Sequence, residues 1–422
     1  MVRTQLTLKI NIPISDAHSD FGHHYELTSK FSPGRSPLKV LLITLATPVP
    51  DGESTRARSV ATRLQSHYFS IISGEYSGGS HWTDANAIEN IHNLMLATGT
   101  DDFSSLADNS YLGRTANLQA DTGISLWSTL LDGSYDDASW MILALWKIAD
   151  YKLARGQDNS AYLASATTIY NIVQGAWDTS VCGGGVWWSS AKDYKNCKNQ
   201  SHTTAYELSK QTAITNELFL LVSATGAINF PSNSAYLTNA NLARNWIKNS
   251  QLRNSQGLFN DGLVTSTCAN NGQTTWIYNQ GVIASGLGAL YAVTRDGTLL
   301  DEAEVTLDAA IQLLTSNSIL KESCDDPVSG GATCDNDQQA FKGIFMKHLQ
   351  YYLDRVNDPA RTAKYSAFIG AQASGVFHFG TSSSNDVGSV WYAPSQGGSQ
   401  FTASSSSSGL AAHIANAKYG PC

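Results

Sequence analysis

From residue 54 onward, apolar residues recur at helical spacing, and clusters of Gly, Pro, Asn or Ser interrupt the pattern repeatedly. The alternation typical of strands is nearly missing, and the aromatic runs 186–188 and 390–392 read better as loop edges. Twelve helices without a linker predict an all-α fold, an (α/α)6 toroid or barrel of six helical hairpins. The helices are predicted at 54–77, 81–98, 103–116, 136–153, 158–178, 205–226, 234–250, 277–294, 298–319, 338–355, 361–374 and 404–419.

The predicted helices alternate in character along the chain. Every second one opens with aromatic or polar residues and then becomes strongly apolar, whereas 158–178 and 298–319 look like ordinary amphipathic exteriors. If the even-numbered helices form an inner ring, their N-terminal ends converge at one end of the ring, which we call the mouth. Gly281, Gly286 and Gly288 all fall within one even-numbered helix. Each costs stability relative to Ala, which makes sense where helices pack closely in a crowded inner ring.

Two neighbouring carboxylates, Asp136 and Asp137, open the fourth predicted helix beside Tyr135 and Trp140. Two carboxylates next to aromatic rings are the smallest set of side chains that can cleave a glycosidic bond. One attacks the anomeric carbon or stabilises its positive charge, and the other donates and accepts the proton. An Asp in the first turn of a helix also satisfies free backbone N–H groups and the positive end of the helix dipole. Taken alone, the pair does not decide between catalysis and capping.

Composition narrows the classes of ligand. The chain has 422 residues, of which 42% are hydrophobic and 15% charged, and it contains 10 Trp and 18 Tyr. A net charge of −8 without a basic stripe argues against nucleic acid or an anionic membrane surface as partner. No C-x-x-C or H-x-x-x-H spacing indicates a metal site, and no stretch outside the N-terminal region approaches membrane-spanning length. We expect a secreted protein that meets neutral, hydroxylated ligands.

Six cysteines and a glycosylation sequon at Asn199 fit an oxidising compartment. Six cysteines allow fifteen connectivities, and nearest-neighbour pairing is our hypothesis among them. It joins Cys182 to Cys197 and Cys324 to Cys334, and it leaves Cys268 and Cys422.

The N-terminal residues 1–53 lack helical periodicity and are expected to be disordered or a wrongly assigned extension. Within them, 35–50 resembles the charged and apolar parts of an export signal, with a short apolar loop packed on the domain as the alternative. Residues 54–422 are then the catalytic domain. The end of the chain lacks the hydrophobic tail of a lipid-anchored precursor, which favours a soluble form.

Six short motifs carry a family resemblance. Each is weak alone, but their order and spacing, from about Trp82 to the last helix, are specific. They are Trp82 with Asn86, Tyr135–Trp140, Gly183–Trp188, Ala213–Phe219, Tyr278–Gly281 and Phe341–Phe345. Together they resemble glycoside hydrolase family 76, the fungal and bacterial endo-α-1,6-mannanases. The resemblance implies an (α/α)6 barrel and a retaining mechanism.

By this resemblance, Asp136 corresponds to the nucleophile and Asp137 to the general acid/base. Repulsion and desolvation in a shared site should leave one acid protonated near neutral pH, while the helix N-terminus favours ionisation of the other. No metal or organic cofactor is expected, because a nucleophile and a general acid/base suffice to cleave a glycosidic bond. The expected substrate-binding residues are Trp82, Asn86, Tyr135, Trp187, Trp188, Tyr278, Asn279 and Gln280.

Several of these residues keep a structural alternative. Trp187 and Trp188 suit sugar stacking and core packing equally well. Glu217, placed mid-helix among Leu and Phe, is better suited to a buried hydrogen bond and is the fallback catalytic acid. Lys342 is expected to neutralise a buried acid or cap a helix end. Asp84 is a candidate for binding sugar hydroxyls, with first-turn capping as the alternative, and His81 is assigned to neither class.

The resulting hypothesis is a secreted or wall-associated enzyme that cleaves internal α-1,6-mannosidic links of mannan. Two rivals remain open. One is a transglycosidase that moves wall glycoproteins from a mannose-containing anchor glycan onto a sugar hydroxyl. The other is a non-catalytic carbohydrate-binding toroid, against which the intact Asp pair argues. The oligomeric state is unknown.

Overall fold

The computed structural model describes residues 51–191, 210–393 and 398–421, all within the compact unit Ala46–Cys422. The signal-like segment 35–50, the sequon at Asn199, and Cys197 and Cys422 lie outside the described residues. The domain boundary that we place at residue 53 stays a prediction. No helix in the described ranges has the length and apolar character needed to cross a bilayer.

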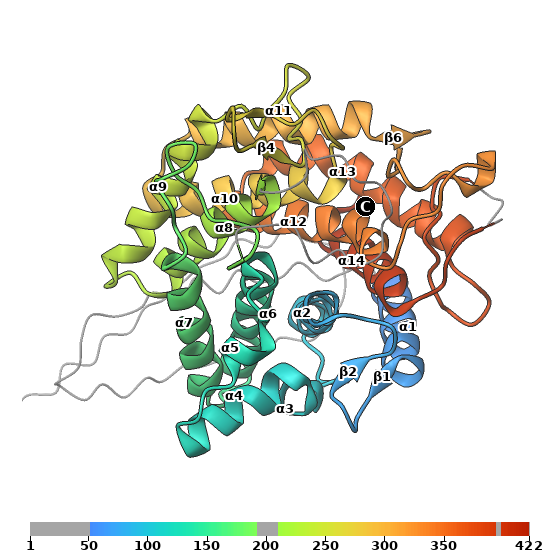
Figure 1. Ribbon diagram of the computed structural model, residues 1–422. Helices are drawn as coiled ribbons and strands as arrows, with labels where there is room; N and C mark the ends of the chain where they lie inside the picture. Colours follow the sequence, from blue (N-terminus) through green and yellow to red (C-terminus); the bar gives the residue numbers. More distant parts are fainter. Residues whose placement is uncertain (1–50, 192–209, 394–397, 422) are drawn as a thin grey trace, which may run out of the picture. The chain divides into compact units, whose positions relative to one another are not determined.

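Six of the described helices, which lie toward the middle of the ribbon in Figure 1, have nearly all of their residues buried. Each packs against the next, and the last packs against the first, so they form an inner ring. These helices are α2 (His81–Thr98), α6 (Tyr135–Ala154), α8 (Ala213–Asn229), α10 (Ile277–Thr294), α12 (Phe341–Val356) and α14 (Ala403–Tyr419).

A second set of helices covers the outside of this ring. These are α1 (Asp51–His67), α4 (Tyr111–Thr122), α7 (Ser160–Gln174), α9 (Ser234–Asn249), α11 (Thr298–Leu313) and α13 (Pro359–Gly375). The prediction of an all-α toroid in which inner and outer helices alternate is confirmed. The inner helices are the even-numbered helices of the sequence pattern, because an element that is apolar all round is stable only when neighbours surround it.

Glycines let the inner helices approach closely. A Cβ built on Gly281 of α10 would stand 2.8 Å from the Cα of Phe345 in α12. At Gly343 of α12 the crowding is greater, since a Cβ would lie 2.2 Å from the Cα of Ser408 in α14. The Gly343 N–H also donates to Ser408 Oγ at 2.7 Å. Neighbouring inner helices therefore touch through their backbones at these points.

Gly343→Ala is expected to lower the free energy of unfolding by about 1–3 kcal/mol, because the added methyl group must push α12 away from α14. The matched control is Gly297→Ala, just before α11, where a Cβ meets nothing within 4 Å. Urea denaturation of both variants measures the difference. Equal stability of the two variants would contradict the close packing of α12 on α14.

The short elements differ most from the sequence prediction. The helix expected at 54–77 ends at His67, and a hairpin of β1 (Phe69–Ser70) and β2 (Glu75–Tyr76) follows. Gly74 in its turn has φ +80° and packs against the backbone of Asn109, which helical continuation would prevent. The expected helix 103–116 is split into α3 (Leu106–Asn109) and α4, because the Ser110 side chain caps α4 by accepting from Gly113 N–H.

Other predicted helices are shorter than expected. The helix expected at 158–178 ends as α7 at Gln174, before Gly175. The helix expected at 298–319 ends as α11 at Leu313, and a hairpin takes its place because Asn317 and Ser318 adopt positive φ. The remaining elements are short. They are β3 (Lys210–Thr212), β4 (Gly262–Val264) and β5 (Ala269–Asn270) in one antiparallel sheet, the hairpin β6 (Thr315–Ser316) with β7 (Ile319–Leu320), α5 (Trp127–Leu130), and the short turns η1 (Pro327–Ser329), η2 (Gln338–Ala340) and η3 (Val376–Gly380).

One predicted disulfide is wrong. Cys182 bonds to Cys268, with a Cα–Cα distance of 5.3 Å, and not to Cys197. The partner lies 86 residues away, between β4 and β5, because this hairpin packs beside the loop that follows α7. The second pair, Cys324–Cys334, is confirmed. Long-range pairing of this kind follows from tertiary packing and not from sequence spacing.

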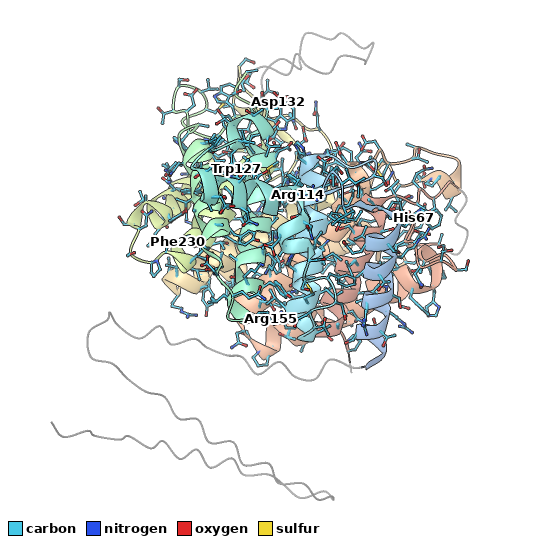
Figure 2. The ribbon with its side chains drawn as sticks, turned by 90° about the horizontal axis from the view of Figure 1, so that it is seen from below. His67, Arg114, Trp127, Asp132, Arg155 and Phe230 are labelled. Atoms are coloured by element: carbon cyan, nitrogen blue, oxygen red, sulfur yellow. A yellow bond between two sulfur atoms is a disulfide. The ribbon has the colours of Figure 1, made fainter. Side chains whose placement is uncertain are left out.

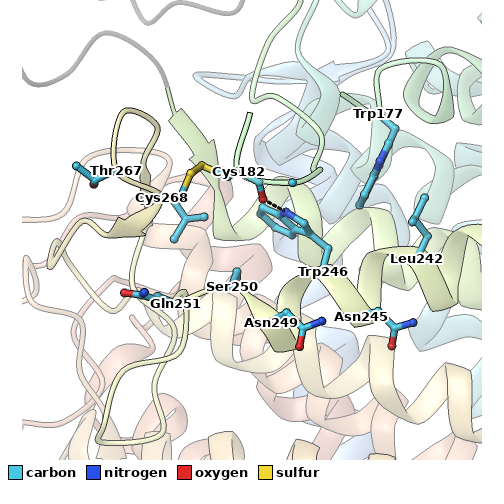
Figure 3. Close-up of a pocket in the computed structure, with 12 residues that line it drawn as sticks. Trp177, Cys182, Leu242, Asn245, Trp246, Asn249, Ser250, Gln251, Thr267 and Cys268 are labelled. Atoms are coloured by element: carbon cyan, nitrogen blue, oxygen red, sulfur yellow. Dashed lines mark hydrogen bonds between the residues drawn. A yellow bond between two sulfur atoms is a disulfide. The ribbon is translucent and has the colours of Figure 1, made fainter. Parts of the chain in front are cut away.

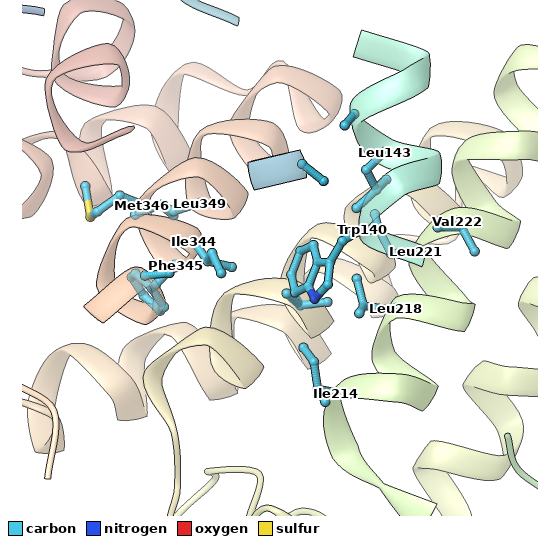
Figure 4. Packing of buried hydrophobic residues seen from close by; sticks show 14 of the residues in the cluster. Trp140, Leu143, Ile214, Leu218, Leu221, Val222, Ile344, Phe345, Met346 and Leu349 are labelled. Carbon is cyan, nitrogen blue, oxygen red and sulfur yellow. The ribbon is translucent and has the colours of Figure 1, made fainter. Parts of the chain in front are cut away.

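Trp140 connects the core of the ring to its mouth. It extends from α6 toward the interior (Figure 4), with its ring centroid 6.1 Å from Trp82 of α2 and 5.8 Å from His348 of α12. Only 2% of its surface is exposed. Trp140 lies one helical turn after Asp136 on α6. Its contact with Trp82 therefore brings α2 close to the beginning of α6.

Candidate active site

The two acids occupy the first turn of α6, at one end of the inner ring. Figure 2 shows both ends of this helix: Asp132 lies just before its start, and Arg155 follows its last residue at the opposite end. Both Asp136 and Asp137 are half-buried. Because the free N–H groups of a helix start carry partial positive charge, this position favours a carboxylate.

A glycine-rich loop, residues 183–190, holds the start of α6. Tyr135 N–H donates to the Trp188 carbonyl at 3.1 Å, and Ser190 N–H donates to the Gly133 carbonyl at 2.9 Å. The side chain of Trp188 completes the junction, because its Nε1–H donates to Asp136 Oδ2 at 3.0 Å. The other oxygen, Asp136 Oδ1, is buried and has no hydrogen bond within the described residues.

This glycine-rich loop is itself clamped from α8. Asn216 Oδ1 accepts from Val186 N–H at 2.8 Å, and Asn216 Nδ2 donates to the Val186 carbonyl at 3.1 Å. Gly184 has φ +147°, and a Cβ there would stand 2.7 Å from the Trp177 ring. The sequence motifs around residues 135, 185 and 216 thus form one structural unit that positions Trp188 against Asp136.

The two acids differ in their tendency to hold a proton. Burial raises the pKa of Asp136 to about 6, opposed by backbone N–H groups of the helix start and by Trp188. Burial also raises the pKa of Asp137 well above its ordinary value, and the negative charges of Asp136 and Asp337 raise it further. Among the described residues, no hydrogen-bond donor opposes this rise at Asp137. Of the two acids, Asp137 therefore keeps its proton to higher pH than Asp136 does.

A third acid at this mouth was missed by the sequence reasoning. Asp337 directly precedes the turn η2 that leads into α12; burial raises its pKa, and the nearby Trp82 side chain opposes this rise. Its charge raises the pKa of both Asp136 and Asp137. In the sequence, Asp337 stands just before the helix predicted at 338–355, where an acid is explained by capping alone. Nothing local indicates that it faces α6.

Aromatic rings gather around Phe341, the first residue of α12. Tyr278 of α10 stacks on it with centroids 3.9 Å apart and planes inclined by 11°. Trp276 and Trp82 lie 5.4 and 6.4 Å from the same ring. The charge of Asp136 contributes to a raised pKa at Tyr278, whose main cause is burial, so the Tyr278 hydroxyl stays neutral. These flat apolar faces beside two acids suit the C–H faces of sugar rings.

Three of the predicted binding residues have their side chains engaged inside the fold. Trp187 is buried and donates to Asp178 Oδ2 at 2.9 Å. Gln280 accepts from Phe259 N–H and donates to the Phe259 carbonyl, both at 2.9 Å. Asn86 accepts from Lys347 Nζ at 2.6 Å and donates to the Trp82 carbonyl at 3.0 Å. These contacts fasten a loop or neighbouring helices.

Tyr135 and Asn279 remain near the mouth. Tyr135 is the first residue of α6, and its side chain is half-buried. Asn279 is 1% exposed in the first turn of α10, and its Oδ1 accepts no hydrogen bond from the described part of the chain. A buried amide oxygen without a hydrogen bond is unfavourable in free energy. A hydroxyl of a bound ligand could donate the missing hydrogen bond to Asn279 Oδ1.

The other acids and bases singled out in the sequence serve the fold. Lys342 forms a buried ion pair with Asp325 and donates to the Ser389 carbonyl, so its expected role in neutralising an acid is confirmed. Asp84 accepts from Tyr76 N–H at 2.8 Å and so ties β2 to α2. His81 contacts Glu75 at 3.2 Å and stacks on Tyr111.

Glu217 is fully buried in α8, and neither carboxylate oxygen has a hydrogen bond within the described residues. Burial raises its pKa well above the ordinary value. The buried hydrogen bond expected for Glu217 is therefore absent from the described part of the chain. Across that part, no three His, Cys, Asp or Glu side chains group as metal ligands would.

Comparison with known proteins agrees with this geometry. A sequence model of glycosyl hydrolase family 76 matches residues 54–419. The chain belongs to glycosyl hydrolase family 76. Similar proteins include the mannan endo-1,6-alpha-mannosidase DFG5 of Saccharomyces cerevisiae, 25% identical over 333 residues, and a putative mannan endo-1,6-alpha-mannosidase of Schizosaccharomyces pombe, 25% identical over 264 residues. The matches cover 75% and 62% of this chain but 65% and 56% of those relatives, so the chain spans less than two thirds of their length.

Solved structures share the family 76 fold. An inactive variant of the α-1,6-mannanase of Salegentibacter sp. HEL1_6, in complex with α-1,6-mannotriose, has a TM-score of 0.68 at 17% identity. That likeness covers 86% of this chain and 99% of the mannanase. Dfg5 from Chaetomium thermophilum, in complex with glucosamine, has a TM-score of 0.66 at 14% identity and covers 88% of this chain and 92% of Dfg5.

Trp188→Phe is expected to move the acidic limb of the pH–activity profile to higher pH. The ring stays, but Asp136 loses the Nε1–H donor that stabilises its ionised form, so its pKa rises. Trp187→Phe is the matched control, because Trp187 donates to Asp178. The measurement is kcat/KM against pH for both variants, and an unmoved limb in Trp188→Phe would contradict this role.

Proposed function

We propose that this chain hydrolyses internal α-1,6-mannosidic bonds of mannan with retention of configuration, with Asp136 as nucleophile and Asp137 as general acid/base. The observation that carries the proposal is the difference in proton affinity between the two acids. Trp188 and the helix start favour the ionised form of Asp136, while no donor within the described residues does so for Asp137, whose pKa is the higher of the two. A retaining glycosidase needs one acid ionised and the other protonated.

The reaction follows in two steps. Asp137 gives its proton to the glycosidic oxygen as the bond from the anomeric carbon to that oxygen breaks, and an oxygen of Asp136 bonds to the same carbon. Asp137, now ionised, then takes a proton from water, whose oxygen attacks the anomeric carbon and releases the Asp136 carboxylate. Each acid ends the cycle in its starting state.

The substrate class is supported by the relatives. The two fungal relatives are named as mannan endo-1,6-alpha-mannosidases. The Salegentibacter mannanase is described as inactive when two consecutive aspartates are replaced by asparagine, and it then holds α-1,6-mannotriose. In this chain, the half-buried rings of Trp82 and Tyr278, which pack against Phe341, would stack on mannose rings, and Asn279 would bind a hydroxyl. The two disulfides of the described residues support an extracellular place of action.

The test is incubation of the purified protein with unbranched α-1,6-mannan, following product size and anomeric configuration by NMR. We expect shorter oligosaccharides whose new reducing ends first appear as the α anomer. First appearance of the β anomer would refute retention. Products that form only with an added acceptor sugar would show the transglycosidase. Binding without any product would show the non-catalytic toroid.

A further inference from the structure

A pocket of about 440 Å³ lies outside the inner ring, between α9, the loop after α7 and the β4–β5 hairpin (Figure 3). Its volume is in the range of pockets that hold small ligands, about 300–1,000 Å³. None of Asp136, Asp137 or Asp337 lines it. It is therefore a site separate from the catalytic mouth.

The lining of this pocket selects for neutral, hydroxylated ligands. None of the described residues that line it is Asp, Glu, Lys, Arg or His. The wall instead combines the indoles of Trp177 and Trp246 with the amides of Asn245, Asn249 and Gln251. A phosphate, carboxylate or cationic ligand would lose its hydration here without gaining a counter-charge. A sugar presents C–H faces to indoles and hydroxyls to amides, so it matches both parts of the wall.

The aromatic part of the pocket is rigid. Trp246 Nε1–H donates to the Cys182 carbonyl at 3.0 Å, and Cys182 is bonded to Cys268 in the turn between β4 and β5. Trp177 meets Trp246 at nearly a right angle, 81°, with centroids 6.3 Å apart. Rings that are fixed before a ligand arrives lose little conformational entropy on binding.

The amide part of the pocket is available. Asn245 and Asn249 are one helical turn apart and project side by side from α9 (Figure 3). Within the described residues, the side chains of Asn249 and Gln251 make no hydrogen bond, and Asn245 receives only a long one of 3.4 Å from Arg244. Both asparagines are exposed and can therefore turn their amides toward a ligand.

We infer that this pocket binds a neutral oligosaccharide, namely a stretch of the mannan chain beyond the part held at the catalytic mouth. The inference rests on the proposed function for the identity of the sugar. A polymer held at two places on one protein gains effective concentration at each of them. The connection that follows α7 carries Cys182 at this pocket and, six residues later, Trp188 at Asp136, so the two sites share one structural element.

The test uses full-length protein carrying Asp136→Asn and Asp137→Asn, so that the probe, α-1,6-mannotetraose, is not consumed. We expect the indole N–H signals of Trp177 and Trp246 to shift on titration, and a further Asn245→Ala/Asn249→Ala change to weaken this binding by about tenfold. Asn241→Ala, an exposed asparagine one turn earlier on α9, is the matched control. Thermal unfolding checks that all variants fold.

The active protein gives a second readout. Asn245→Ala/Asn249→Ala is expected to raise the ratio of KM for long mannan to KM for mannotetraose about threefold or more. Indole signals that do not shift, or an unchanged ratio, would overturn the inference while leaving the catalytic proposal intact. Shifts without cleavage of mannan by the unmodified protein would keep the pocket as a sugar site and overturn the catalytic proposal.

Discussion

Asp137→Asn is expected to slow hydrolysis of α-1,6-mannan by about 10²–10⁴-fold, because the leaving oxygen loses its proton donor. Asp136→Asn is expected to lose more, since no covalent intermediate can form on an amide. Measurement of reducing ends released from unbranched mannan tests both variants. Asp132→Asn, an exposed acid just before α6, is the matched control and should retain activity.

A substrate with a good leaving group separates the two roles. With a nitrophenyl α-mannoside, bond cleavage needs little proton donation, so Asp137→Asn should release nitrophenol rapidly and then accumulate the glycosyl-enzyme. Asp136→Asn should release none. Retained mannan cleavage in both variants, or equal behaviour on the aryl substrate, would reject the assignment of Asp136 and Asp137.

Neither substitution should unfold the protein. The folded-state pKa of each acid is raised, so its contribution to stability is present below the unfolded pKa and is lost as pH rises through the folded value. At neutral pH an amide, which carries no charge to desolvate, should leave the unfolding midpoint equal or higher. A large fall in the midpoint would mean that the acids are structural.

The second large effect is the dependence of activity on pH. The active form needs Asp136 ionised and Asp137 protonated. Activity should therefore fall as pH drops through about 6, where Asp136 gains a proton, and fall again at higher pH, where Asp137 loses one. We expect a bell-shaped profile of kcat/KM whose limbs belong to the pair as a whole, because the two acids interact.

Asp337→Asn is expected to move both limbs of that profile to lower pH. Removing its negative charge makes ionisation of Asp136 and Asp137 easier, so both pKa values fall. Asp121→Asn, a surface acid at the end of α4, is the matched control because its charge acts on neither member of the pair. An unmoved profile, or a move to higher pH, would remove Asp337 from the site.

The sequence alone determined the helical framework and the position of the acids. The predicted helices 81–98 and 277–294 agree with α2 and α10 to the residue. This works because a helix forms through bonds between residues four apart, and because its apolar pattern shows how much of its surface is covered. The apolar pattern of residues 136–153 likewise predicted a helix that begins at Asp136 and Asp137, and these acids lie in the first turn of α6.

Only the tertiary structure decided which side chains meet. Cys182 pairs with a cysteine 86 residues away, and Asp337, just before the turn η2, raises the pKa of Asp136 and Asp137 on α6. Trp188 bonds to Asp136, while its neighbour Trp187 bonds to Asp178. These partners lie on different helices and loops, and no pattern along the chain records which of them the ring brings together. Proton affinity and hydrogen bonding depend on that proximity and on burial, and both arise only when the inner helices pack.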